Sequence, residues 1–526
     1  MKRIKKLASL LLAMVMVLAM GTTVFAGGEV TDPQEPNATS YSITIENATP
    51  GHVYEAYQIF AGDLYEEPQE DGSVKKTLSN IVWGAGVSAD GQTVMGDAAE
   101  KAETITDSNV AQFAQDISVY LTTPSGSTNT ITDNNTYVIS NLPAGYYLVK
   151  DADGSLLGDD NYTTFILEVV SNATAVPKNS GTPESDKQVK DKNDSENTET
   201  EWQDSADYDI GDHVPYLLTA KLPDTITAYD TYKLVFHDKL SAGLTYDGDD
   251  TVKVSVKNGE STTVITEGYT IASAEGELTV TFANVKAAPV NATNKSEIYV
   301  EYTATLNERA NIGAEGNINT LTLEYSNNPN STGNGDNEPT GTTPPTTAIV
   351  FTFETVVNKV DETKNPLAGA AFKLEKLVKN DAGEENWVEV RAYEAGADTS
   401  FSFSGLDDGK YKLTETVTPD GYNSIDPIYF MITATHVEKE DKSGDELKEL
   451  NVVATDDKWT PLTGENVTKF EVTVSTGTGT TNIVNQSGTV LPSTGGIGTT
   501  IFYVIGGILV VAAGVLLVTK KRMKAE

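Results

Sequence analysis

The 526-residue sequence contains no cysteine and only four histidines. Without cysteine the chain cannot form disulfide bonds, and it has neither a thiol nucleophile nor a cysteine-based zinc site. The histidines are scattered, without the spacing of metal ligands, at His52, His213, His237 and His436. The sequence also has no Gly-x-Ser-x-Gly nucleophile motif. We therefore expect a protein that is not an enzyme and that holds neither a cofactor nor a metal ion.

Basic residues are scarce as well. The chain has 37 lysines and arginines against 76 aspartates and glutamates, and its formal net charge is −39. So acidic a balance excludes nucleic acid and anionic membrane surfaces as binding partners. It is typical of a soluble extracellular surface that resists self-association.

Long apolar runs occur only at the two ends of the chain. At the N-terminus, Lys2, Arg3, Lys5 and Lys6 precede the apolar run 7–20, and Val24-Phe25-Ala26 supplies the small residues of a signal-peptidase site. Residues 1–26 are therefore predicted to be a cleaved signal peptide. An exported chain without disulfides needs another covalent device to resist force and proteolysis.

The C-terminal end combines three features in a fixed order. Leu491-Pro492-Ser493-Thr494-Gly495 is followed by the apolar run 501–518 and by the basic tail 519–526. We predict a transmembrane segment at 501–518 and a cytoplasmic tail after it. The pentapeptide resembles the LPxTG sorting signal of Gram-positive surface proteins. That resemblance implies that a membrane sortase attacks the carbonyl of Thr494 and passes the chain to an amine, either of peptidoglycan or of another copy.

The body of the chain is predicted to be all-β. Short runs rich in Val, Ile, Thr, Tyr and Phe alternate with Gly, Asn and Asp turns, as in residues 41–45, 278–282 and 470–474. One short helix is expected at 109–121. The segments 177–200 and 327–347 are rich in polar residues, Gly and Pro and read as linkers, so three domains are expected. Their predicted limits are 40–178, 184–328 and 348–486.

The third domain carries a family likeness. Its segment 366–374, PLAGAAFKL, resembles the opening of CnaB-type immunoglobulin-like β-sandwich domains, and 405–416 with 419–422 resembles the E-box segment of sortase-assembled pilins. The first domain has a related run at 142–149 without the glutamate, and the second resembles the middle domain of the same pilins. Nearly the whole chain therefore resembles the SpaA-type backbone, or shaft, pilins of Gram-positive bacteria. In these pilins an isopeptide bond between two side chains of one domain, called a staple below, cross-links strands of that domain.

In such pilins a buried lysine joins an asparagine carboxamide with the help of a buried acid. Burial removes the charge of the lysine and makes it a nucleophile. In the third domain the resemblance assigns these roles to Lys359, Glu415 and Asn485. Strand periodicity agrees, because Lys359 shares the parity of the apolar residues Phe353 and Val357.

In the second domain the assignment leaves alternatives open. Lys187 has the parity of Val189 and is preferred to Lys190, while Asp238 is the expected acid. Asn327 shares the parity of the preceding apolar residues and is preferred to Asn328. No comparable set of residues occurs in the first domain, so no staple is expected there.

A shaft pilin also needs a lysine that receives Thr494 of its neighbour. The segment 175–179, AVPKN, resembles the pilin motif that holds this lysine, so the resemblance points to Lys178. It implies a structural shaft subunit of a pilus on the Gram-positive cell wall, which supports adhesion. Its partners would be sortase, further copies of itself, accessory pilins, peptidoglycan and a host or matrix receptor. The alternative is a monomeric wall-anchored adhesin with immunoglobulin-like stalk domains.

Overall fold

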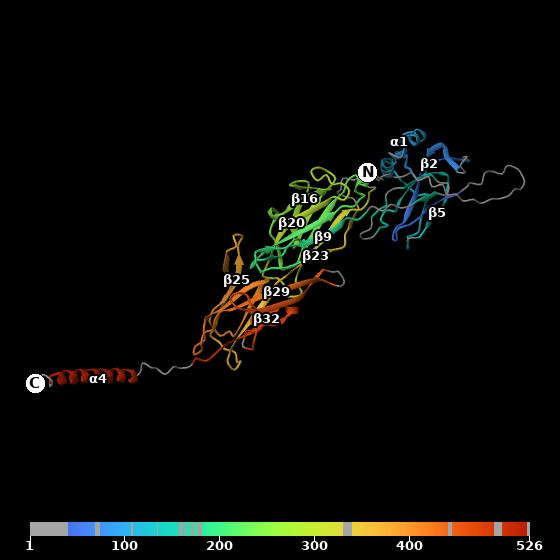
Figure 1. The fold of residues 1–526 in the computed structure, drawn as a ribbon. Coiled ribbons are helices and arrows are strands. Elements are labelled where there is room, and N and C mark those ends of the chain that lie inside the picture. Colours follow the sequence, from blue (N-terminus) through green and yellow to red (C-terminus); the bar gives the residue numbers. More distant parts are fainter. Residues whose placement is uncertain are drawn as a thin grey trace, which may run out of the picture.

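Three domains follow one another in chain order, with helix α4 (Ile497–Arg522) beyond the third (Figure 1). The computed structural model describes residues 40–68, 74–106, 109–133, 135–156, 161–163, 166–169, 173–175, 181–329, 339–439, 444–465, 467–488 and 497–522. The predicted signal peptide, Lys178 and the sorting signal 491–495 lie outside the described residues. The predicted all-β architecture of tandem domains is confirmed.

The first domain combines two sheets with three short helices. The sheets have the strand orders β5-β1-β8 and β3-β2-β6-β7, with β4 added to β2. The predicted helix at 109–121 forms as α3, whose Val110, Phe113 and Ile117 share one face and join the core beside Phe60. The elements are β1 (Tyr41–Ile45), β2 (Tyr54–Pro68), β3 (Val74–Trp83), α1 (Ala89–Met95), α2 (Ala98–Glu103), α3 (Val110–Ser118), β4 (Gly126–Ser127), β5 (Tyr137–Leu142), β6 (Gly145–Asp151), β7 (Ile166–Val169) and β8 (Ala173–Ala175).

The second domain is a sandwich of two sheets. One has the order β12-β23-β21-β14-β19-β18, with β22 on β21, and the other β17-β16-β20-β13-β9, with β15 on β20. Buried and exposed residues alternate along its long strands, so each sheet turns one apolar face inward. The strands are β9 (Glu184–Val189), β10 (Lys192–Asn193), β11 (Thr198–Glu199), β12 (Ser205–Asp207), β13 (His213–Lys221), β14 (Leu234–Leu240), β15 (Leu244–Tyr246), β16 (Lys253–Asn258), β17 (Ser261–Ile265), β18 (Thr270–Ala274), β19 (Glu277–Phe282), β20 (Glu297–Leu306), β21 (Asn317–Ser326), β22 (Thr340–Thr342) and β23 (Thr346–Phe351).

The third domain is a second, smaller sandwich. Its sheets have the orders β27-β24-β32-β31 and β26-β25-β28-β29-β30. In the first of these, β24 and β32 run parallel, so the first and last long strands of the domain are direct neighbours. The strands are β24 (Phe353–Asp361), β25 (Ala371–Lys379), β26 (Glu385–Tyr393), β27 (Ser400–Leu406), β28 (Gly409–Val417), β29 (Ile428–Glu438), β30 (Asp445–Thr455), β31 (Glu471–Thr473) and β32 (Thr478–Asn485).

Strand β23 contributes side chains to the cores of both the second and the third domain. It pairs with β21 and β12 of the second domain. Its side chains alternate, so Val350 enters the core of the second domain while Ile349 and Phe351 enter the core of the third. The structure therefore corrects the predicted linker 327–347 and the boundary at 348, because β22 and β23 complete the second domain up to Phe351.

Helix α4 covers the apolar run 501–518 near the C-terminus. Among the residues that the structure describes, no helix is both long enough and apolar enough to cross a membrane. The run is thus helical along its whole length.

Candidate functional site

The third domain brings Lys359, Glu415 and Asn485 together in its interior. Lys359 on β24 lies opposite Ile483 of the neighbouring strand β32, and Asn485 follows two residues later on the same face. Glu415 reaches the same point from β28 in the opposing sheet. All three side chains are excluded from solvent, with Lys359 and Asn485 each 0% exposed.

The contacts in this cluster suit amide formation. Lys359 Nζ lies 3.9 Å from Glu415 Oε1 and donates to the Ile483 carbonyl at 2.9 Å. Asn485 Nδ2 donates to both oxygens of Glu415, at 3.0 and 3.1 Å. Burial lowers the pKa of Lys359 to about 8, although the charge of Glu415 opposes the shift. A lysine whose pKa is lowered, a carboxamide and a carboxyl group thus meet in a site closed to solvent.

The second domain builds a similar cluster across its two sheets. Lys187 on β9 and Asp238 on β14 are both buried, and Nζ lies 2.5 Å from Asp238 Oδ1. Lys187 Nζ also lies 4.8 Å from the ring centre of Tyr216 and 5.7 Å from that of Tyr302. Burial lowers the pKa of Lys187, and Asp238 opposes that shift. Lys190, the alternative lysine, instead pairs with the exposed Glu199 at 2.6 Å.

The structure does not bring the predicted acceptor Asn327 to this cluster. On β21, Leu321 lies opposite Asp238, so Asn327 stands six residues further along, about 20 Å away at the rise of a strand. Its carbonyl accepts from Tyr162 N, in the first domain. Asn319, two residues before Leu321, is fully buried, and its Nδ2 donates at 2.6 Å to the Tyr302 hydroxyl, which donates to Asp238. Asn319 is therefore the buried asparagine that hydrogen bonds connect to Lys187, through Tyr302 and Asp238.

The first domain differs from the other two. Among its described side chains no lysine is buried. Its buried polar pair is His52 with Asp151, whose Nδ1 and Oδ1 atoms lie 2.6 Å apart, and Thr163 N also donates to Asp151. This pair joins a loop to β6 and offers no amine nucleophile.

The segment around Lys178 connects the first two domains. Strand β8 ends at Ala175 beside β1 of the first domain. At the other end of the segment, Gly181 N donates to Thr225 Oγ1 of the second domain at 2.8 Å. Lys178 and Thr494 themselves lie outside the described residues, so the structure does not test the predicted linkage.

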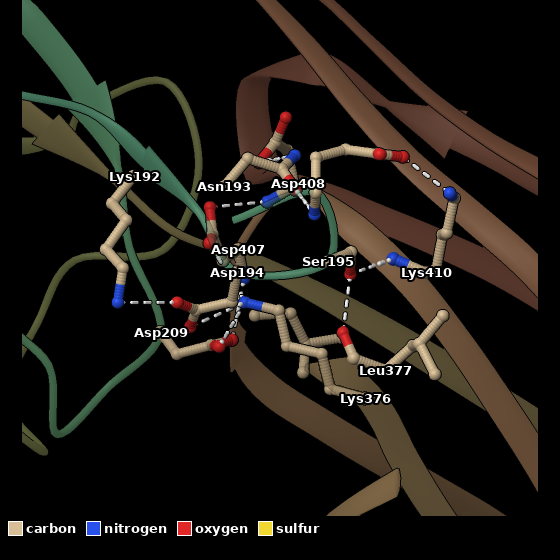
Figure 2. Close-up of polar contacts among 12 residues, drawn as sticks. Lys192, Asn193, Asp194, Ser195, Asp209, Lys376, Leu377, Asp407, Asp408 and Lys410 are labelled. Atoms are coloured by element: carbon tan, nitrogen blue, oxygen red, sulfur yellow. Dashed lines mark hydrogen bonds and ion pairs between the residues drawn. The ribbon is translucent and has the colours of Figure 1, made fainter. Parts of the chain in front are cut away.

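A third polar cluster, missed in the sequence, joins the second and third domains (Figure 2). Lys376 of β25 is almost fully buried, and its Nζ lies 2.5 Å from Asp209 Oδ2 and 2.9 Å from Asp407 Oδ2. Asp194 Oδ2 lies 3.6 Å away. Burial would lower the pKa of Lys376, but Tyr411, Asp407 and Asp209 outweigh it and raise the pKa. The carboxylates here are close enough to share a metal ion, and the lysine ammonium lies among them.

The turn between β10 and β11 adds further contacts between the second and third domains. Together with the Lys376 cluster it forms the joint between these domains. Ser195 Oγ donates to the Leu377 carbonyl at 2.7 Å and accepts from Lys410 N at 2.9 Å. Asn193 Nδ2 donates to Asp408 at 2.8 Å, and Lys410 Nζ pairs with Glu196 at 2.5 Å. In the sequence, the density of Asp and Asn in 191–197 is typical of a linker and gives no other signal of this contact.

Comparisons with known proteins agree with this architecture. Residues 354–447 match the model of the SpaA prealbumin-like fold domain. Residues 210–329 match that of the Gram-positive pilin backbone subunit 2, Cna-B-like domain. Residues 483–525 match the LPXTG cell wall anchor motif.

Two relatives from Streptococcus pyogenes serotype M6 extend the comparison. The trypsin-resistant surface T6 protein is 27% identical over 374 residues, which is 60% of this chain and 65% of the relative. The solved T6 backbone pilin has a modular three-domain structure; its similarity covers 86% of this chain and 99% of that one at 18% identity and a TM-score of 0.52. At 18% identity, this structural similarity establishes the fold alone.

Along the chain, the backbone-subunit match comes first, the prealbumin-like match second and the anchor motif last. They coincide with the second sandwich, the third sandwich and the C-terminal end of the chain. Over these residues the chain therefore carries domains similar to those of Gram-positive backbone pilins, together with an LPXTG cell wall anchor motif.

Proposed function

We propose that this chain is the shaft subunit of a covalently polymerised pilus. Sortase joins Thr494 of one copy to Lys178 of the next, and a final transfer anchors the polymer to peptidoglycan. Accessory pilins and a host or matrix receptor are the further partners that an adhesive shaft would have. The only chemistry that the chain performs by itself is the formation of amide bonds inside its own domains.

One observation carries this proposal: buried lysine–acid–asparagine clusters connect strands near the two ends of a domain. Lys359 and Asn485 lie on β24 and β32, and Lys187 and Asn319 lie on β9 and β21. Force along a polymer enters each domain at one end of its chain and leaves at the other. An amide bond between such strands carries that force without unfolding the sheet between them.

The position of the Lys178 segment supports head-to-tail growth. It lies between the first and second domains, whereas Thr494 follows the third. Residue 177 is proline, a residue type that restricts φ and has no backbone N–H donor, and this property favours presentation of the next residue to an enzyme. Each linkage would then leave two stapled domains in the path of tension between neighbouring subunits.

The linkage is tested by replacing the lysine. In Lys178→Ala, the high-molecular-weight ladder of wall extracts should collapse to monomer, whereas Lys458→Ala, which removes an exposed lysine of the third domain, should leave it unchanged. A ladder that persists in Lys178→Ala refutes this lysine. A wild type without any ladder refutes the shaft and favours the monomeric adhesin.

The internal amides are tested by mass. Each bond releases one ammonia, so the intact body should weigh about 34 Da less than its sequence when both have formed. An unshifted mass would exclude them.

A further inference from the structure

A tyrosine hydroxyl links the acid and the carboxamide of the second-domain cluster. Tyr302 on β20 is buried, its hydroxyl donates to Asp238 Oδ2, and it accepts from Asn319 Nδ2 at 2.6 Å. On the other oxygen of the same carboxylate, Lys187 Nζ lies 2.5 Å from Oδ1. A continuous chain of hydrogen bonds thus runs from the lysine nitrogen, through carboxylate and hydroxyl, to the carboxamide nitrogen.

Amide formation needs a proton to move along such a path. When Lys187 Nζ attacks Cγ of Asn319, the new N–C bond forms and the C–Nδ2 bond must break. The attacking amine gives up one proton, and Nδ2 needs one more to leave as ammonia. A positioned group that delivers this proton lowers the barrier to bond cleavage.

We propose that Tyr302 is a catalytic residue that delivers this proton to the leaving nitrogen. Asp238 takes one proton from the attacking amine of Lys187, and the attack makes Cγ tetrahedral, which frees the lone pair of Nδ2. Tyr302 then turns its hydroxyl proton to Nδ2, and Asp238 returns a proton to the tyrosine oxygen. Both side chains end as they began, ammonia leaves, and the amide remains. This inference rests on the proposed second-domain staple and names the residue that completes it.

The third domain shows why only one of the two clusters requires a relay. There the acid is a glutamate, and Asn485 Nδ2 contacts both oxygens of Glu415 directly, at 3.0 and 3.1 Å. The second domain has an aspartate, which is one methylene shorter, and the hydroxyl of Tyr302 lies between acid and carboxamide. Burial and the charge of Asp238 raise the pKa of Tyr302, so the hydroxyl enters the reaction with its proton.

The substitution Tyr302→Phe tests the relay, because it keeps the ring that packs 5.4 Å from Tyr216 and removes only the hydroxyl. The full chain is made by cell-free synthesis and sampled for intact mass over time. The variant should complete one loss of about 17 Da, from the third domain, at the wild-type rate. Its second loss should slow by about 10²–10⁴-fold, the usual contribution of a positioned acid.

Tyr232→Phe is the matched control. Tyr232 is also buried in the second domain, and its hydroxyl has no hydrogen-bond partner among the described residues. This variant should lose both ammonia molecules at the wild-type rate. Amide hydrogen exchange of β13 and β20 establishes that each variant has folded.

Each remaining outcome decides a separate question. A folded Tyr302→Phe chain that loses both ammonia molecules at the wild-type rate overturns the relay and leaves the staple standing. A wild type that never shows the second loss overturns the staple itself. If Tyr302→Phe does not fold, 3-fluorotyrosine at position 302 keeps the hydroxyl but makes it more acidic. The relay then requires a changed rate and pH profile, and an unchanged rate rejects it.

Discussion

At the scale of single residues, the third-domain cluster depends on one carboxyl group that contacts both reacting partners. Glu415 is hydrogen-bonded to Asn485 and lies 3.9 Å from the amine of Lys359. The Asn485 oxygen Oδ1 has no hydrogen-bond partner among the described residues. A buried carboxamide that is only partly satisfied suits a reactive group better than a structural one.

Glu415→Gln keeps the size of this side chain and removes its acid. We expect the third-domain amide not to form in this variant. The difference between its sequence mass and its measured mass should therefore be about 17 Da smaller than in the wild type. Because the amide closes a loop of more than 100 residues, its loss should lower the free energy of unfolding by about 5 kcal/mol on the chain-entropy scale used for cross-links. Glu449→Gln, at an exposed site on β30, is the control. A normal mass deficit in Glu415→Gln would contradict the role of the acid.

The sequence predicts on which face of a strand a side chain lies better than it predicts which residues of neighbouring strands lie opposite each other. Alternation places Lys359 and Lys187 in the interior, and both are buried, as is Asp238, the expected acid. Asn319 has the same parity as the predicted acceptor Asn327, so alternation along β21 and the residue after it does not separate the two. Only the register of β21 against β14 distinguishes them, and that register depends on long-range pairing that no local pattern encodes.

At the scale of elements, the second and third domains meet through two glycines. A Cβ at Gly313 would lie 2.3 Å from the Thr476 carbonyl carbon, and one at Gly477 would lie 2.4 Å from Gly313 Cα. Gly313 N donates to the Thr352 carbonyl at 2.9 Å, directly after the shared strand β23. The joint thus needs a backbone-to-backbone approach that only glycine permits.

Gly313→Ala should therefore loosen the joint. Gly383→Ala is a matched control, because the two glycines have φ of 84° and 80° but Gly383 has nothing within 4 Å of an added Cβ. Backbone strain should cost both variants a similar amount, about 1 kcal/mol. Only Gly313→Ala should also broaden the distribution of distances between spin labels on the two domains. Equal distributions in the two variants would contradict a close-packed joint.

The elements that the sequence missed have identifiable causes. Strands with clear alternation, such as β1 and β19, were predicted. Helices α1 and α2 have only 7 and 6 residues, too few for a periodic signal, and each begins at one capping side chain, Ser88 or Asp97. Strand β22 is Thr-Gly-Thr, so composition marks it as a loop, and its pairing with β21 supplies the order.

At the scale of the whole molecule, the buried Lys376 is the main cation of an acidic joint. Lys376→Met keeps the length of the side chain and leaves Asp209 and Asp407 without their partner. Removing one member of a buried ion pair typically costs about 3–5 kcal/mol. Lys373→Met, on the same strand, breaks a partly exposed pair with Glu375 and should cost at most about 1 kcal/mol. Differential scanning calorimetry of both variants measures the difference, and equal losses would contradict a joint held by Lys376.

The other groups of this joint make it sensitive to pH. Burial, with the charge of Asp408, raises the pKa of Asp191 to about 7, and burial with Asp209 raises that of Asp212 to about 6. Burial and neighbouring carboxylates also raise the pKa of Asp207 and Asp407. His436, which faces Asp207, has its pKa lowered by burial to about 4 and stays neutral across this range.

These carboxyl groups bind protons more tightly in the folded joint than in an unfolded chain, where their pKa is about 3.9. Their contribution is therefore fully present only below about 3.9, and it is lost progressively as the pH rises from there through about 6 to 7. The calorimetric midpoint of the second and third domains should accordingly be higher at pH 5 than at pH 8. In the double variant Asp191→Asn/Asp212→Asn, which cannot titrate at these positions, the difference should shrink. A wild-type midpoint that is the same at both values, or an undiminished difference in the variant, would refute this account and leave the joint as a purely geometric contact.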